Sequence, residues 1–82
     1  MLATVASITS ANRLRRRLAE SGIDARVVQT PASLAREGCG YSLRFDDSYK
    51  TLAQSAAADL KIKIRAFFYE RIQDGQKKYI KV

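Results

Sequence analysis

The chain has 82 residues, of which 46% are hydrophobic and 28% are charged, and this composition indicates one small globular domain, residues 1–82, rather than a disordered segment. It contains no histidine and a single cysteine, Cys39, which excludes an internal disulfide, a histidine general base and a serine–histidine–aspartate triad. Fifteen Lys and Arg against eight Asp and Glu give a net charge of +7, which suits an anionic partner or simply a soluble surface.

The first residues lack the basic start and long apolar run of a signal peptide, and no apolar stretch approaches the ~20 residues of a membrane helix. A lone free thiol is typical of a reducing compartment. We therefore expect a cytoplasmic protein without a membrane contact.

Strand and helix signals alternate at the start of the chain. The β-branched apolar residues of segment 1–8 predict a strand, and Thr9-Ser10 offers hydroxyls that can cap a helix. Three apolar residues then recur at helical spacing: Ala11, Leu14 and Leu18. Gly22 is typical of the residue that ends a helix in the left-handed conformation, so we expect a helix over residues 10–21.

The middle of the chain predicts two strands joined by an irregular connection. Residues 25–29 favour a strand that Thr30-Pro31 ends, because proline cannot donate to a ladder. Residues 31–40 form the least regular segment, with one helical turn after the proline and a loop at Gly38-Cys39-Gly40. Residues 41–45 alternate, with Tyr41, Leu43 and Phe45 on one face of a half-buried strand.

A second helix and a hairpin complete the pattern. The cluster Asp46-Asp47-Ser48 can cap a helix over residues 47–60, whose apolar stripe would be Tyr49, Leu52, Ala53, Ala56 and Leu60. From residue 61 the pattern is strand-like, with Ile62, Ile64, Ala66 and Phe68 sharing a face. Asp74-Gly75 predicts a two-residue turn that pairs residues 69–72 with 76–82.

The order of these elements predicts an α+β fold. We expect a ferredoxin-like βαββαβ sandwich with an additional C-terminal hairpin strand, in which two helices cover one face of a mostly antiparallel sheet. The final strand, residues 76–82, would leave unpaired backbone groups through which copies of the chain could form a homo-oligomer by edge-strand pairing.

Cys39 is the most conspicuous chemical group of the sequence. Gly38 and Gly40 flank it without side-chain cover, so an exposed sulfur is expected. Arg36 and Arg44 lie close in sequence, and a neighbouring cation favours the thiolate, which attacks persulfides, disulfides and selenium donors. The alternative is an inert cysteine tucked under its loop.

A run of arginines forms the second candidate site. Arg13, Arg15, Arg16 and Arg17 crowd the first predicted helix, and they either dock phosphate or an acidic partner or simply form a solvated face. Aromatic residues on the late strands could stack bases, but no stretch matches the glycine–aromatic pattern of an RNA-recognition strand, so nucleic-acid binding is not expected. The spacing proposes no metal site, phosphate loop or nucleophile–base pair, so we expect no metal, no cofactor and no enzymatic activity.

The segments Thr30-Pro31, Cys39-Gly40 and Leu43-Arg44-Phe45 resemble a small bacterial family of selenium/sulfur-carrier-like proteins. The resemblance includes the first strand and the turn at Gly22-Ile23, and it departs after Leu60. It implies a non-enzymatic carrier in which Cys39 holds sulfur or selenium for hand-over between a protein donor and a protein acceptor, with Arg44 or Arg36 stabilising the charged terminal atom. The rival hypotheses are a binding or regulatory module that docks an acidic protein or nucleic acid through the arginine-rich helix, and a structural subunit of a larger assembly.

Overall fold

The computed structural model describes residues 1–35 and 40–82. In chain order its elements are β1 (Leu2–Val5), α1 (Ile8–Glu20), β2 (Arg26–Gln29), β3 (Tyr41–Arg44), a 3-10 turn η1 (Asp47–Tyr49), α2 (Lys50–Asp59), β4 (Ala66–Gln73) and β5 (Gln76–Lys81). The prediction of an α+β fold with two helices and an antiparallel sheet is confirmed.

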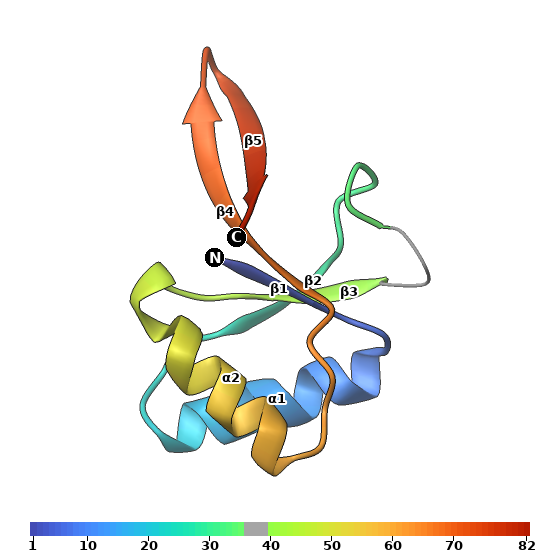
Figure 1. Ribbon diagram of the computed structural model, residues 1–82, viewed down its shortest axis with the longest axis vertical. Coiled ribbons are helices and arrows are strands. Elements are labelled where there is room, and N and C mark those ends of the chain that lie inside the picture. Colours follow the sequence, from blue (N-terminus) through green and yellow to red (C-terminus); the bar gives the residue numbers. More distant parts are fainter. Residues whose placement is uncertain (36–39) are drawn as a thin grey trace.

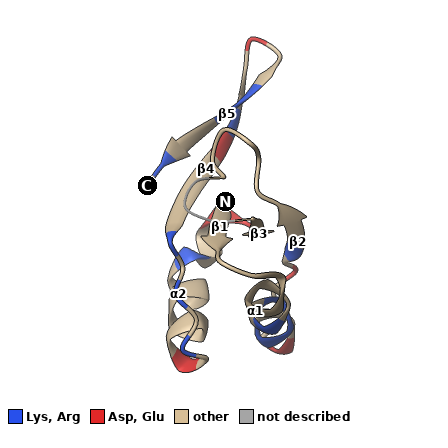
Figure 2. Ribbon diagram, turned by 90° about the vertical axis from the view of Figure 1, so that its right-hand side faces the viewer, with Lys and Arg blue, Asp and Glu red and all other residues tan. Residues whose placement is uncertain are grey.

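The described strands form one five-stranded sheet in the order β2-β3-β1-β4-β5, with every neighbouring pair antiparallel. Both helices cover the same face of this sheet (Figure 1) and lie side by side beneath it (Figure 2). Neither described helix has the length and hydrophobicity required to span a bilayer.

The core fills the space between the helices and the sheet. Strand β1 is buried along its whole length because it lies between β3 and β4 in a sheet whose one face is covered by the helices (Figure 1). The predicted stripe of α1, Ala11, Leu14 and Leu18, is buried as expected, and α2 contributes Ala53, Ala56 and Ala57. Short alanine side chains let α2 approach the sheet closely, and burial of this apolar surface is the main stabilising contribution to the fold.

Both ends of α1 follow from local chemistry, although its start differs from the prediction. Gly22 has φ +78°, its amide donates to the Ala19 carbonyl, and the Ile23 amide donates to the Leu18 carbonyl. These hydrogen bonds are typical of a helix that ends at a glycine in the left-handed conformation. The predicted strand over residues 1–8 was too long and the cap at Thr9-Ser10 was wrong. Ser7 is the cap, because its extended backbone lets its Oγ accept from the Ser10 amide at 3.1 Å.

Two expectations about the second half of the chain were wrong. Leu52 is 53% exposed, since the alanine face of α2 points to the core instead. Phe68 does not share a face with Ile62 and Ile64. Residues 61–65 are not a strand, so the alternation of inward and outward side chains begins only at Ala66. As a result Phe67 packs against the core, opposite Ala3 in the sheet.

The predicted hairpin is confirmed. Asp74 and Gly75 have φ of +53° and +75°, as a two-residue turn with right-handed strand twist requires. Strands β4 and β5 pair from Phe68↔Lys81 to Gln73↔Gln76, and the hairpin projects from the two-layer body (Figure 1).

Candidate functional site

The candidate site lies on the connection between β2 and β3. Cys39, together with Arg36 and Gly38, lies outside the described residues, so the structure describes the anchors of this connection and its surroundings. Of the residues predicted to support Cys39, the structure describes Gly40 and Arg44.

Two contacts close the base of the connection. The Thr30 amide donates to the Gly40 carbonyl at 3.0 Å, which extends the β2–β3 ladder by one position. The hydroxyls of Thr30 and Ser42 share a hydrogen bond of 2.7 Å, and both residues are buried. Buried hydroxyls that satisfy each other hold the two ends of the connection together, because separating them would leave both unpaired away from water.

The first part of the connection forms the turn that the sequence predicted after Pro31. The Leu34 amide donates to the Pro31 carbonyl at 2.8 Å. Ser33 and Leu34 then line a hollow of about 250 Å³ together with Phe68 of β4 and Lys81 of β5. The start of the connection is therefore placed against the base of the β4–β5 hairpin.

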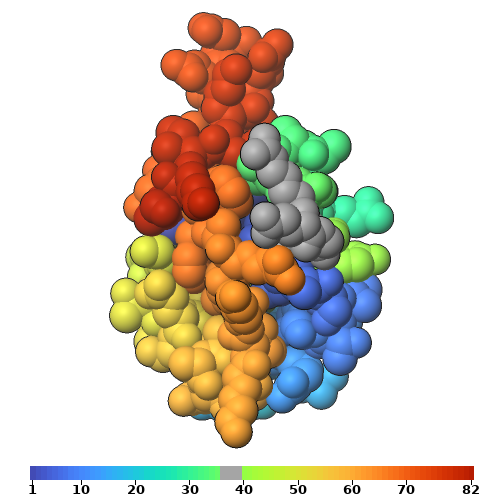
Figure 3. Space-filling model, turned by 45° about the vertical axis from the view of Figure 1, so that its right-hand side comes forward, coloured from blue at the N-terminus to red at the C-terminus, as the bar shows by residue number. Residues whose placement is uncertain are grey.

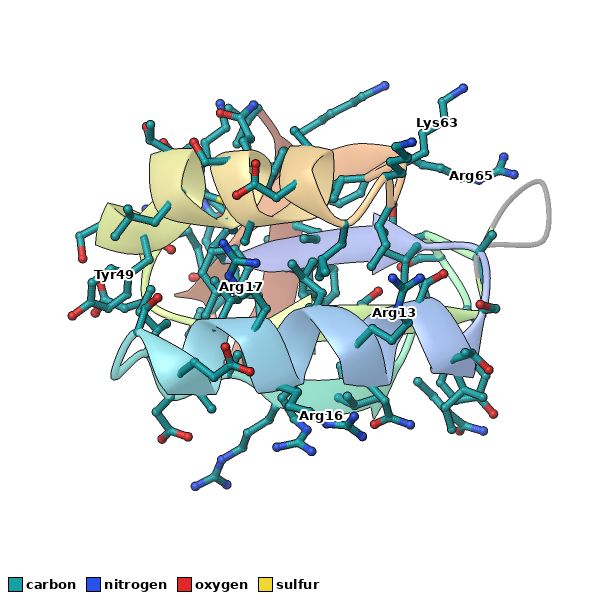
Figure 4. The ribbon with its side chains drawn as sticks, turned by 90° about the horizontal axis from the view of Figure 1, so that it is seen from below. Arg13, Arg16, Arg17, Tyr49, Lys63 and Arg65 are labelled. Carbon is teal, nitrogen blue, oxygen red and sulfur yellow. The ribbon has the colours of Figure 1, made fainter. Side chains whose placement is uncertain are left out.

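The start of α1 and Arg65 lie at the same end of the sheet as Gly40. Tyr41 is opposite Val5 in the sheet, two residues before the Ser7 cap, and the Arg65 amide donates to the Thr4 carbonyl at 2.9 Å. The first turn of α1 has no acidic residue, so its positive dipole end is not offset there. Sequence reasoning did not single out Arg65, because only the pairing of β1 with β4 brings it to this end (Figure 4).

Arg44 has a partner that sequence reasoning did not include. Its Nε and Nη2 donate to the two carboxylate oxygens of Glu70 at 2.7 and 2.9 Å. This hydrogen bonding raises the pKa of Arg44 above its ordinary value. Arg44 also lies at the opposite end of β3 from Gly40, about 13 Å away along the strand. Its guanidinium therefore joins β3 to β4.

Glu70 is a partly buried carboxylate between two cations. Burial raises its pKa, but the hydrogen bonds and charge of Arg44 outweigh that effect, assisted by the Lys77 ammonium 3.5 Å away. The pKa of Glu70 is consequently below its ordinary value, and the carboxylate is ionised at neutral pH.

The arginine run of α1 divides into two kinds of residue. Arg13 and Arg16 are exposed, whereas Arg15 and Arg17 are half-buried. Arg17 forms an ion pair with Asp59 at 3.1 Å and so links α1 to α2. Arg13, Arg16 and Arg17 line a hollow of about 180 Å³ with Glu20 and Leu60, and Arg13 and Arg17 point towards α2 (Figure 4).

No group of three or more His, Cys, Asp or Glu side chains that could hold a metal ion occurs in residues 1–35 and 40–82. What the structure defines is a small α+β domain whose β2–β3 connection carries the single cysteine of the chain.

The chain belongs to the family described as "Putative Se/S carrier protein-like", whose model matches residues 1–69. The resemblance seen in the sequence is thereby confirmed, and the match extends beyond Leu60 to include the first half of β4. Residues 70–82, which comprise the second half of β4, the turn and all of β5, lie outside it. No curated protein and no solved structure matches the chain.

Proposed function

We propose that this protein carries sulfur or selenium on Cys39, hands it to a partner protein, and is not itself an enzyme. One observation carries the proposal. The chain is a member of a carrier-like family, and its single cysteine stands on a connection whose base is held by the Thr30–Gly40 backbone bond and the buried Thr30–Ser42 bond. A carrier needs one nucleophile on a stable frame, and it needs no general base of its own.

The transfer step requires only thiolate exchange. The Cys39 thiolate attacks the outer sulfur of a donor persulfide, a bond forms between Sγ and that sulfur, and the bond to the donor's inner sulfur breaks. The donor leaves as a thiolate with the bonding electron pair, so no external oxidant or reductant is consumed. The same step with a selenium atom in the outer position loads selenium.

Positive charge near the sulfur would favour the attacking thiolate and the charged persulfide. Arg36, with Gly38 and Gly40 beside the cysteine, is the candidate given by the sequence. The positive end of α1 and the backbone of Arg65 lie at the same end of the sheet as Gly40 and would add to that support. Arg44 is bonded to Glu70, so its contribution at the sulfur is the weaker of the two arginines named from the sequence.

We also infer that the core is ferredoxin-like. The central strands β1 and β3, flanked by β2 and β4, with α1 and α2 on one face, suit this arrangement, and β5 is the added strand. A reducing cytoplasm suits a carrier, because the resting thiol must stay free between loading events.

The proposal is tested by intact mass spectrometry of protein purified without reductant or treated with a low-molecular-weight persulfide. The expected result is an adduct of about 32 Da for sulfur or about 80 Da for selenium that a dithiol removes and that Cys39→Ser lacks. The dithiol step is essential, because a sulfinic acid adds nearly the same mass and is not reversed by thiols. A cysteine that takes up no removable adduct would contradict carriage.

The second candidate function is a docking module, favoured by the exposed arginines beside the α1–α2 hollow. In that function Arg13, Arg15, Arg16 and Arg17 would hold an acidic protein or nucleic acid by charge. Binding that is unchanged in Cys39→Ser but lost when Arg13 and Arg16 are reversed would favour docking over carriage.

A further inference from the structure

Strand β5, one of the two outer strands of the sheet, has one edge without a partner strand among the described residues. It stands at the end of the order β2-β3-β1-β4-β5 and pairs with β4 alone. The Val82 amide donates to the Phe67 carbonyl directly opposite, so alternate residues of β5 bond inwards. By that alternation the backbone N–H and C=O groups of Lys77, Tyr79 and Lys81 point outwards from the edge.

The side chains around this edge are both basic and apolar. Ile72, Ile80 and Val82 are 78%, 53% and 50% exposed. Lys78 and Lys81 form no ion pair with any residue that the structure describes. Both kinds of side chain meet in a hollow of about 590 Å³, which is lined by Arg71, Ile72, Gln73, Lys78, Tyr79 and Ile80.

The hairpin is also accessible. It rises clear of the body of the molecule (Figure 3), and almost all of β5 is exposed. Residues 70–82, which include all of β5, fall outside the family match.

From these observations we infer that β5 is a docking edge for an extended acidic and apolar segment of a partner protein, which adds to the sheet as a further strand. Main-chain bonds to Lys77, Tyr79 and Lys81 would provide affinity, and the lysines of β5 with Ile80 among them would select the sequence. A strand placed there passes Lys81, which lines the hollow at Ser33 and Leu34, so the partner reaches the connection that bears Cys39.

A second copy of the chain is a poorer occupant of the same edge. The antiparallel registers that pair most of β5 with itself are centred on Tyr79, which places Lys77 opposite Lys81, or on Lys78, which places that lysine opposite itself. Like charges directly opposite in a sheet are destabilising. Nucleic acid would satisfy the lysines but would leave the exposed isoleucines and the backbone edge unused.

A matched pair of variants tests strand addition. Tyr79→Pro removes an outward amide without removing a bond to β4, whereas Tyr79→Ala removes the same side chain and keeps the amide. The probe is a short fluorescent peptide of alternating glutamate and valine, and binding is measured by anisotropy. We expect Tyr79→Pro to weaken the Kd about tenfold relative to Tyr79→Ala. Lys78→Gln with Lys81→Gln should weaken binding and reduce its salt dependence.

Two further measurements make the outcome decisive. The same peptide N-methylated at alternate residues should lose binding to the unmodified protein, which tests the main-chain bonds even if Tyr79→Pro does not fold. Cys39→Ser should bind the peptide normally, so this inference does not depend on what Cys39 carries. Equal binding by Tyr79→Pro and Tyr79→Ala, equal binding of a lysine–valine peptide, tighter binding of an oligonucleotide, or dimerisation through β5 would each overturn it.

Discussion

Arg44 and Glu70 form a two-point ion pair that reaches across the central strand β1. The two bonds measure 2.7 and 2.9 Å, and Leu2 of β1 lies between their strands, opposite Arg44 on one side and Phe68 on the other. A planar guanidinium matched to both carboxylate oxygens is the strong form of such a pair. This contact therefore joins the strand that follows the cysteine connection to the strand that forms the hairpin.

The first prediction concerns this pair. Glu70→Gln should lower the free energy of unfolding by about 1–2 kcal/mol at neutral pH, because Arg44 loses a charged partner in a partly buried position. Since the folded pKa of Glu70 is below its ordinary 4.5, its contribution is complete above that pH and is lost as the pH falls through the folded value. Urea unfolding should show that the free energy of unfolding falls less between pH 7 and pH 3 in Glu70→Gln than in the unmodified protein. An equal fall in both proteins would contradict the prediction. Asp74→Asn, an exposed carboxylate at the turn, is the matched control.

A second prediction concerns the base of the connection. Ser42→Ala should cost about 1–2 kcal/mol, because the buried Thr30 hydroxyl loses its partner. Thr30→Val should cost a similar amount, and the double variant should cost less than the two single changes added together. Chemical unfolding of all four proteins gives the coupling directly. Strictly additive losses would mean that the two hydroxyls do not stabilise each other.

The third prediction compares alanine substitutions at the three glycines that the structure describes. Gly75→Ala and Gly22→Ala should each destabilise the protein by about 1 kcal/mol, because both residues have positive φ. Gly40→Ala should be neutral or slightly stabilising, since Gly40 does not have positive φ and nothing lies within 4 Å of an added Cβ. Thermal unfolding distinguishes the outcomes. A large loss for Gly40→Ala would show a requirement at the connection that the backbone does not reveal.

The fourth prediction concerns the cause of thiolate formation. We expect Cys39 to be alkylated as a thiolate below the ~8.5 pKa of a free cysteine. Arg36→Ala and Arg65→Ala should raise the pH at which the rate reaches half its maximum. Arg44→Ala should move it least, because Glu70 already holds that guanidinium. Rates of iodoacetamide reaction against pH measure this, with Cys39→Ser as the blank. If Arg44→Ala moved the half-maximal pH most, the expected ranking of the three arginines would be wrong.

A fifth prediction concerns the basic face of α1. Reversing Arg13 and Arg16 to glutamate should reduce retention on heparin more than reversing Lys78 and Lys81, although the net charge changes equally. The reason is that the α1 arginines act together beside one hollow. Retention should fall with salt, as counterion release requires. Equal shifts for the two charge-reversed proteins would mean that only total charge matters.

Local features of this protein follow from its sequence because they depend on neighbouring residues alone. The buried stripe of α1, the end of that helix at Gly22 and the turn at Asp74-Gly75 need only helical spacing or a residue that accepts positive φ. The family to which the chain belongs was likewise accessible from the sequence. The exact start of α1 was not, because Ser7, Thr9 and Ser10 all offer capping hydroxyls.

The contacts that surround the site depend on strand order, which no local pattern contains. Glu70 meets Arg44 only because β4 lies beside β1 and β1 beside β3, and Arg65 reaches the Gly40 end of the sheet for the same reason. The face of Phe67 also depends on where β4 begins, after the irregular residues 61–65. Neighbouring residues are enough to indicate the two helices, the turns and the candidate nucleophile, but not the start of α1 or the buried face of α2. The tertiary structure alone decided which charges are paired and which strand edge is open, because these depend on residues brought together by folding rather than by the chain.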